Sequence, residues 1–197
     1  MKIAVLGAGH VGPVIARLAL AAGYPVAIAG SGDPSRIEMI TEFLAPGAVA
    51  LSAADAVADA GLVVLAIPWH RFATLEPGMF AGKVVVDAMN HWPPASAPSG
   101  TSEEVAARLV GAQVVKTLNH VAYQDMEPAA GRALGVAGDS PAAVEAVVSF
   151  LERIGFDPVP VGPLAAGRLL EPGSPVFGAA ARRPEFEKLE MLAKEQS

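Results

Sequence analysis

The sequence predicts an α/β protein with a Rossmann-like, doubly wound and mostly parallel sheet, small additional strands and a C-terminal helical tail. Three observations predict this fold. A short apolar run near the start leads directly into a glycine loop with the spacing G-x-G-x-x-G. Strand-like apolar runs then alternate with amphipathic helical patterns, which is typical of βαβ units. Finally, 52% of the 197 residues are hydrophobic, which suffices for a large core.

The first dozen residues organise the chain. Residues 3–6 are apolar and long enough for one buried strand, and Gly7, Gly9 and Gly12 follow at once. The next residues place apolar side chains on one helical face, so the glycines lie between a strand and a helix. In that setting Gly7 permits the tight turn, Gly9 lets the backbone approach a pyrophosphate, and Gly12 lets helix and strand pack closely. A free helix N-terminus also attracts phosphate. We therefore predict a dinucleotide site formed by Gly7, Gly9, His10, Val11 and Gly12; the alternative is a glycine-rich turn without a ligand.

The next elements are predicted from residues that typically begin or end helices. Gly23 closes the first helix, Pro34 suits the first turn of a second helix, Pro46 ends it, and Ser52 caps a third. The apolar run 62–66 is the clearest buried strand, and it ends in Ile-Pro-Trp. We expect strands over 25–29, 48–51, 62–66 and 83–87, and helices over 34–45, 53–60 and 70–75.

The second half continues the alternation after a loop over 90–100 that contains three prolines. Acidic residues after Thr101 favour a helix start there, because they complement the helix dipole. Ser140 and Pro141 cap and start a long helix that Gly155 ends. We expect strands over 114–118, 133–137 and 158–161, and helices over 101–109, 141–154, 164–171 and 184–194. The chain is expected to form a single domain, with a dinucleotide-binding part over about 1–118 and a smaller part over about 119–197.

The end of the second strand indicates which dinucleotide is bound. An NAD site usually holds the ribose 2′-hydroxyl with a carboxylate at this point, and here the strand ends in Gly30 and Ser31. Ser31, Ser35 and Arg36 instead offer hydroxyls and a guanidinium, which suit a 2′-phosphate. We therefore predict NADP(H). Asp33 in the same loop is the feature against this prediction, and Arg36 can equally be a solvated residue of a surface helix.

Two further segments follow strands at the predicted carboxyl edge, where α/β sheets bind ligands. The first contains Asn90 and Trp92, and the second contains Asn119, His120 and Tyr123. Either asparagine could bind a carboxamide or a carbonyl, and His120 or Tyr123 could donate a proton. Asn119, His120 and Tyr123 are therefore weak catalytic candidates. The alternative is that the asparagines satisfy loop backbone and His120 is an ordinary buried histidine.

Composition excludes several functions. The net charge of −6 and the pI near 5.2 argue against nucleic acid and against an anionic membrane surface. The chain has no cysteine, which excludes thiol catalysis, disulfides and cysteine-ligated metals. The four histidines are widely spaced, so we predict no metal site. We also expect no membrane span, a small-molecule substrate and a cytoplasmic location.

The sequence resembles the family of coenzyme F420-dependent NADP oxidoreductases, in particular a bacterial branch. The resemblance covers nearly the whole chain. It is carried by the glycine loop and by Ile-Pro-Trp at 67–69, Gly-Thr-Ser at 100–102, Val-Val-Lys at 114–116, Gly-Phe-Asp-Pro at 155–158, Gly-Pro-Leu at 162–164 and Arg-Leu-Leu-Glu at 168–171. It implies a homodimer in which Ile67, Pro68 and Trp69 lie along the nicotinamide, while Ser31 and Arg36 hold the 2′-phosphate. The chain departs from archaeal members in the loop after the second strand and in the segments that follow Asp87 and Leu118.

The resemblance implies reversible hydride transfer between NADP(H) and the deazaflavin F420, a second planar ring that would stack over the nicotinamide near Asn90. Such a reaction needs two rings held in a dry cleft and little acid–base help. An NADPH-dependent reductase of a small imine, ketone or flavin remains an alternative, as does a non-catalytic NADP(H)-binding sensor, because function depends on the site rather than on the fold.

Overall fold

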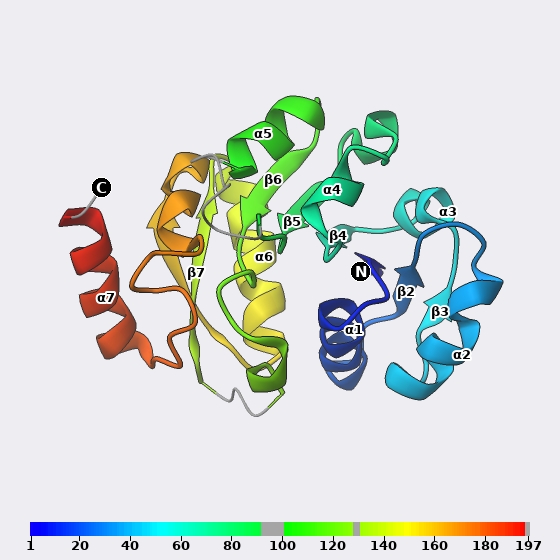
Figure 1. Ribbon diagram of the computed structural model, residues 1–197, viewed down its shortest axis with the longest axis horizontal. Coiled ribbons are helices and arrows are strands. Elements are labelled where there is room, and N and C mark those ends of the chain that lie inside the picture. Colours follow the sequence, from blue (N-terminus) through cyan, green and yellow to red (C-terminus); the bar gives the residue numbers. More distant parts are fainter. Residues whose placement is uncertain (92–100, 128–130, 196–197) are drawn as a thin grey trace.

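In the computed structural model, one sheet extends through both the N-terminal and the C-terminal part of the chain (Figure 1). The structure describes residues 1–91, 101–127 and 131–195. The strand order is β3-β2-β1-β4-β5-β6-β7-β8, and all neighbours are parallel except β6 and β7. The first six strands have the order of a dinucleotide-binding sheet. The predicted doubly wound, mostly parallel fold is confirmed.

All eight predicted strands are present, and helices separate most of them. The strands are β1 (Ile3–Leu6), β2 (Val26–Ala29), β3 (Val49–Ala50), β4 (Leu62–Leu65), β5 (Val84–Asp87), β6 (Gln113–Lys116), β7 (Ala133–Gly138) and β8 (Asp157–Gly162). The helices are α1 (Val11–Ala21), α2 (Ser35–Leu44), α3 (Ala53–Ala58), α4 (Trp69–Phe72), α5 (Thr101–Arg108), α6 (Pro141–Arg153) and α7 (Arg183–Glu195). Short 3-10 helices are η1 (Pro77–Phe80), η3 (Tyr123–Asp125) and η4 (Leu164–Leu170).

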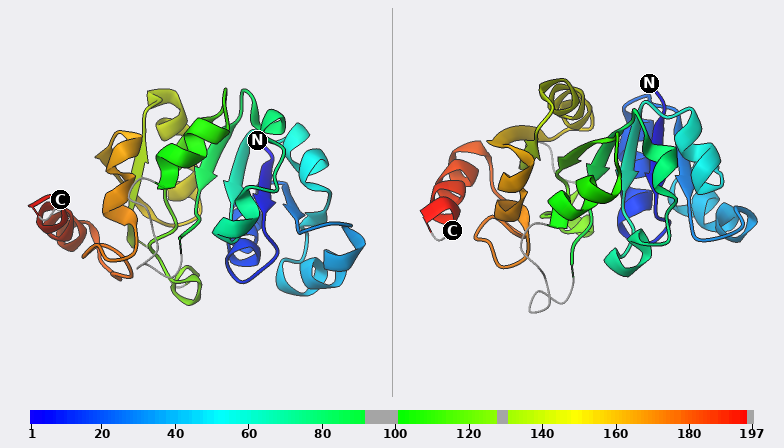
Figure 2. Two further views of the ribbon diagram at one scale, coloured as in Figure 1. Left: turned by 45° about the horizontal axis from the view of Figure 1, so that its top comes forward. Right: turned by 90° about the horizontal axis from the view of Figure 1, so that it is seen from above.

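Helices cover both faces of the sheet, as the two views of Figure 2 show. Side chains of α1, α2 and α6 share one apolar core with one face of the strands. Side chains of α3, η1 and α5 pack on the opposite face. A third apolar cluster joins β7 and β8 to η4 and α7. None of the described helices is long and apolar enough to cross a membrane.

Several elements differ from the prediction. α3 and α4 end at Ala58 and Phe72 rather than at residues 60 and 75, and the helix predicted over 164–171 is the 3-10 helix η4. Two strands, β3 and β6, are also shorter than predicted. β3 has only two residues and lies at one edge of the sheet, where it pairs with β2 alone. β6 ends at Lys116, two residues before the predicted end, and Leu118 adopts a left-handed backbone conformation with φ of +67°. A fully buried leucine pays a steric penalty in that region. The chain therefore leaves the sheet earlier than the apolar pattern predicts.

A buried ion cluster joins the ends of β5 and β6. Lys116 and Asp87 are register partners, both fully buried, and their Nζ and Oδ2 atoms lie 3.2 Å apart. The Lys116 ammonium also lies 3.0 Å from Glu171 Oε1 and donates to the Met89 carbonyl at 2.7 Å. Ser102 at the start of α5 donates to Asp87, and Thr101 donates to Glu171. A single lysine thus connects two strands, α5 and the segment after η4.

Glycine at position 167 allows this connection. A Cβ atom there would lie 3.1 Å from Lys116 Cγ, tighter than nine in ten real contacts of that kind, so a side chain would require the lysine stem or η4 to shift by a few tenths of an ångström. Lys116 is therefore enclosed by η4 on one side and by the sheet on the other. Removing its charge would leave two carboxylates without their cation.

We expect Lys116→Met to lower the free energy of unfolding by about 3–5 kcal/mol, because breaking a buried ion pair on one side leaves uncompensated charge. Urea unfolding followed by circular dichroism measures the change. Lys188→Met is the matched control, since Lys188 is exposed on α7 and should change stability by less than about 0.5 kcal/mol. Equal unfolding midpoints for the two variants would contradict this role of the cluster.

Candidate functional site

The glycine loop between β1 and α1 is built as the spacing predicts. Gly7 has φ of +130°, and a Cβ on it would lie 2.2 Å from the Ala66 carbonyl oxygen. A Cβ on Gly12 would lie 1.8 Å from the Gly7 carbonyl oxygen. Gly9 differs from both, because a Cβ there would meet no atom within 4 Å. Gly7 and Gly12 are thus required by the packing of the loop, whereas Gly9 leaves open space outside it.

The N-terminus of α1 faces the same open space. His10 occupies the N-cap position without a side-chain cap, and no acidic residue stands in the first turn. Unsatisfied backbone N–H groups and the positive end of the helix dipole favour an anion at this point. The loop and helix together therefore fit a phosphate that approaches the backbone at Gly9.

On one side of the loop lies a hollow of about 320 Å³, which we name the Ser31 hollow. Its wall is formed by the ends of β1, β2 and β4 and by the turns after them. The lining residues are Leu6, Gly7, Ala8, Gly9, Ala29, Gly30, Ser31, Ile37, Ala53, Ala66, Ile67, Pro68, Arg71, Thr74 and Leu75. A Cβ on Gly30 would lie 2.7 Å from Ile37 Cγ2, so the close packing of α2 against β2 depends on that glycine.

A second hollow of about 250 Å³, named here the Asn119 hollow, lies near the carboxyl ends of β5 and β6. It is lined by Val11, Ala88, Asn90, Leu118, Asn119, His120, Val121, Ala122, Tyr123, Gln124, Met126, Phe177 and Gly178. Val11 belongs to the first turn of α1, so this hollow also borders the glycine loop. None of these lining residues is an aspartate, glutamate, lysine or arginine.

Asn90 and Asn119 form a reciprocal pair within the Asn119 hollow. Asn119 Nδ2 donates to Asn90 Oδ1 at 3.0 Å and to the Leu170 carbonyl at 2.7 Å, and Asn90 Nδ2 donates to the Asn119 carbonyl at 2.7 Å. The pair adjoins the buried ion cluster at both ends, because Met89 precedes Asn90 and Glu171 follows Leu170. The ion cluster therefore fixes the backbone that carries the two amides.

His120 is held as a neutral imidazole. Its Nε2 accepts from the Gly135 backbone N–H at 3.1 Å, which leaves the proton on Nδ1, 3.4 Å from Asn119 Oδ1. Burial and the positive charge of Lys116 lower the pKa of His120 from 6.5 to about 3. A group with these contacts is poorly suited to donate a proton near neutral pH. The contacts favour the structural alternative for this residue.

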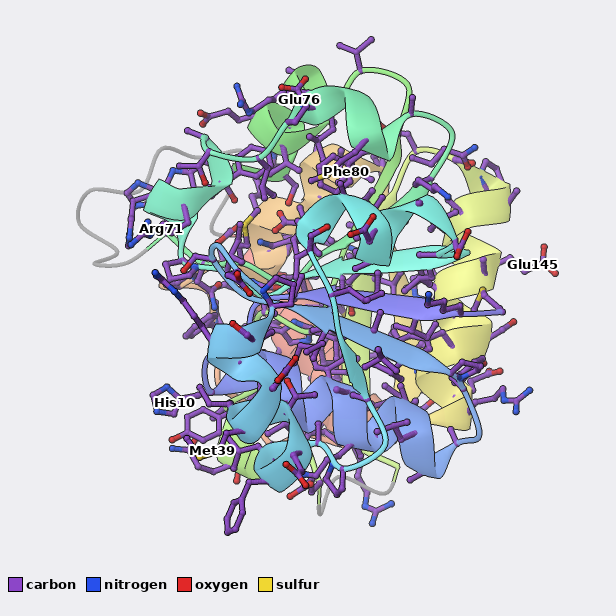
Figure 3. All side chains as sticks on the ribbon, turned by 90° about the vertical axis from the view of Figure 1, so that its right-hand side faces the viewer. His10, Met39, Arg71, Glu76, Phe80 and Glu145 are labelled. Atoms are coloured by element: carbon purple, nitrogen blue, oxygen red, sulfur yellow. The ribbon has the colours of Figure 1, made fainter. Side chains whose placement is uncertain are left out.

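Tyr123 is a better-placed proton donor. It is half-buried, lines the Asn119 hollow, and stacks on His10 with ring centroids 5.2 Å apart. This contact joins the loop after β6 to the glycine loop. Figure 3 shows His10 at the same edge of the sheet as Arg71.

The structure brings most of the predicted site residues to this edge. Gly7, Gly9, Ser31, Ile67 and Pro68 line the Ser31 hollow, and Val11, Asn90, Asn119, His120 and Tyr123 line the Asn119 hollow. Trp69 lines neither. Its ring stacks on Phe72 at 5.7 Å and contacts His91 at 5.8 Å, beside α5.

Two residues predicted to hold the 2′-phosphate also line neither hollow. Ser35 and Arg36 are exposed in the first turn of α2 and do not line the Ser31 hollow, and Trp92 lies outside the described residues. Arg71, which lines the Ser31 hollow, was not predicted from the sequence. The one available signal was its position two residues after Ile-Pro-Trp, in a turn that follows a strand at the binding edge.

The chain is similar to a family of NADP oxidoreductases and to several solved structures. Residues 2–91 match the family model described as NADP oxidoreductase, coenzyme F420-dependent, which confirms the resemblance predicted from the sequence. A hypothetical protein from Sinorhizobium meliloti is similar with a TM-score of 0.82 and 29% identity, over 93% of this chain and 96% of that chain. A protein from Arthrobacter sp. FB24, provisionally named an F420-dependent NADP reductase, is similar with a TM-score of 0.75 and 29% identity, over 85% and 87% of the two chains.

An imine reductase from a Pseudomonas species is also similar in fold, with a TM-score of 0.64. The identity is 20%, and the match covers 97% of this chain and 60% of the imine reductase. This similarity supports the Rossmann-like architecture and carries no conclusion about the reaction.

We expect Gly9→Val to fold normally and to lose dinucleotide binding, because the new side chain would occupy the open space next to the backbone at residue 9. Circular dichroism reports the fold and fluorescence titration with NADPH reports binding. Gly12→Val is the matched contrast: its Cβ has no room, so it should unfold or fail to accumulate. Unchanged binding by folded Gly9→Val would mean that the glycines form only a turn.

Stability should depend on pH through His120. The pKa of His120 is about 3 in the folded chain and 6.5 as the ordinary value, so between these values the unfolded chain binds the extra proton. Stability should therefore be full above pH 6.5 and fall below it, by up to about 1.4 kcal/mol per pH unit. His120→Gln should flatten this slope in urea unfolding between pH 7 and pH 5, whereas the exposed control His70→Gln should keep it. The same slope in both variants would contradict this assignment.

Proposed function

This chain is an NADP-dependent oxidoreductase whose residues 2–91 match the coenzyme F420-dependent family, and from that premise we propose that it catalyses reversible hydride transfer between NADP(H) and a planar acceptor. The first candidate for the acceptor is the deazaflavin F420. The proposed acceptor position is the Asn119 hollow. We further propose a cytoplasmic homodimer, in which a second copy would close the open side of the cleft.

The observation that supports this proposal is the neutrality of the Asn119 hollow. Its asparagine amides are occupied by each other and by backbone, and its imidazole accepts from Gly135 and has a pKa near 3. Such a hollow can position a ring, but among the residues that line it only Tyr123 is a suitable acid. Hydride transfer between two stacked rings depends chiefly on positioning, so it fits a site of this composition.

The residues around the glycine loop fit NADP(H). The open side of Gly9 and the free N-terminus of α1 would hold the pyrophosphate, and His10 and Val11 would border it. We propose Ser31, with Ser35 and Arg36 beside it, for the adenosine end. Ile67 and Pro68 would form an apolar wall, because proline has no N–H to leave unsatisfied. When bound, NADPH supplies the hydride.

A second candidate function is the reduction of a small imine or ketone. It is supported by the position of Tyr123 and by the lack of a cationic side chain in the lining of the Asn119 hollow. No lysine or arginine lines the Asn119 hollow, and residues 92–100 include none in the sequence. A small neutral imine or ketone would need no cation there. An imine or ketone would also need a proton, which the phenol of Tyr123 could donate.

An acceptor panel with NADPH distinguishes the two candidates. We expect reduction of F420, with less than about a tenfold loss of turnover in Tyr123→Phe, because no side chain need supply a proton. If the acceptor is an imine or ketone, the same variant should lose about 10²–10⁴-fold, which is typical of a removed general acid. His120 is less suitable for this test, since its replacement also removes the acceptor for Gly135 N–H.

Stopped-flow spectroscopy with F420, FMN, FAD and simple imines measures these rates. Absence of F420 turnover, together with Tyr123-dependent reduction of an imine or ketone, would overturn the deazaflavin assignment. Absence of turnover with every acceptor in the panel would contradict both candidates.

A further inference from the structure

Arg71 is the one charged residue among those that line the Ser31 hollow. It lies in α4, directly after the turn that follows β4, and so reaches the hollow from the side opposite the β2 loop. The other lining residues are glycines, aliphatic side chains, Pro68, Ser31 and Thr74, so no carboxylate in the lining neutralises the guanidinium. Figure 3 shows Arg71 at the edge of the molecule where His10 also lies.

The Arg71 side chain is free to bind a ligand. Its backbone is committed to the helix, since its N–H donates to the Pro68 carbonyl at 2.8 Å and its carbonyl accepts from Thr74 Oγ1 at 2.7 Å. In the described part of the chain its guanidinium makes no hydrogen bond or ion pair. Arg108 on α5 is a contrast, because its guanidinium binds the Ala73 and Leu75 carbonyls. Those contacts fix the end of the same turn and leave Arg71 available.

The chemistry of the hollow points to a phosphate monoester. Arginine forms two parallel hydrogen bonds with a phosphate, and such pairs are stronger than hydrogen bonds between neutral groups. Ser31 supplies a hydroxyl on the opposite wall, and Ile37, Ala53 and Leu75 supply apolar surface for a base. A ribose that carries a 2′-hydroxyl would leave the guanidinium without a partner.

Arg36 is placed less favourably. It is exposed at the second position of α2, and it is the next residue, Ile37, that turns into the hollow. Successive residues of a helix point about 100° apart, so the Arg36 side chain leaves the helix in another direction. The sequence pattern predicts that the cation comes from Arg36, after β2. The hollow is instead lined by Arg71, which follows β4.

We propose that Arg71 binds the ribose 2′-phosphate of NADP(H) and is the residue that distinguishes it from NAD(H). The proposal rests on the proposed NADP(H) function and adds a specificity residue to it. Arg71 would act as a binding residue, with Ser31 as its partner across the phosphate. It plays no part in the hydride transfer.

Calorimetric titration of the full chain with NADPH, NADH and 2′,5′-ADP tests this proposal without any acceptor. The parent protein should prefer NADPH over NADH by at least about tenfold, which corresponds to about 1.4 kcal/mol. Arg71→Gln should bind NADPH and 2′,5′-ADP at least about tenfold more weakly and bind NADH as the parent does. Arg71→Lys should fall between the two, since it retains the charge and loses the paired hydrogen bonds.

Two further variants serve as controls. His70→Gln changes an exposed neighbour on α4 and should leave all three affinities unchanged. Arg36→Gln should have a smaller effect on NADPH than Arg71→Gln. A selective loss in Arg36→Gln alone, or an equal loss of NADPH and NADH in Arg71→Gln, would overturn the proposal. If Arg71→Gln keeps the parent's preference for NADPH over NADH, the proposal for Arg71 is overturned and the proposed function stands. If the parent protein binds NADPH and NADH equally well, the NADP(H) assignment itself is refuted.

Discussion

The site depends on one buried interaction, the contact of Lys116 with Asp87 and Glu171. Burial of Lys116 and Asp87 is unfavourable unless each finds partners, and here they bind each other, while Ser102 donates to Asp87 and the partly buried Glu171 adds a second carboxylate to the lysine. The cluster ties β5 to β6 and both to α5 and to the segment after η4. It therefore determines where the chain leaves the sheet and where Asn90 and Asn119 stand.

The charged residues of the ion cluster do not line the Asn119 hollow. The ion cluster lies behind the asparagine pair, while no acidic or basic residue lines the Asn119 hollow itself. This separation lets the protein use strong, short-range interactions for positioning and still present a neutral wall to a ligand. The lysine also acts on the site indirectly, because its charge contributes to the low pKa of His120 and so keeps that ring uncharged. On the other side of the glycine loop the arrangement is reversed, and the Arg71 guanidinium, which has no partner among the described residues, lines the Ser31 hollow.

Much of the fold and the glycine loop could be predicted from the sequence, because these features depend on the local order of residues along the chain. The apolar run before Gly7, the glycine spacing and the helix after Gly12 together specify the turn and its ligand class. The alternation of apolar runs with capped helices likewise specifies eight strands and their approximate limits. The edge position of β3 and the early end of β6 were not predicted, since the apolar pattern does not show how many neighbours a strand has or where a backbone turns left-handed.

The sequence by itself determined the fold class, the glycine loop and the segments that meet at the carboxyl edge of the sheet. Only the tertiary structure decided which side chains line the two hollows. Trp69 turns toward Phe72 and α5, His120 turns toward the backbone of β7, and Arg71 rather than Arg36 lines the Ser31 hollow. The physical reason is that these orientations depend on contacts between segments far apart in the chain. The sequence around a histidine does not show whether its ring faces solvent or accepts a hydrogen bond from a distant strand, as His120 does from Gly135. Only the neighbours in the folded chain distinguish the two cases.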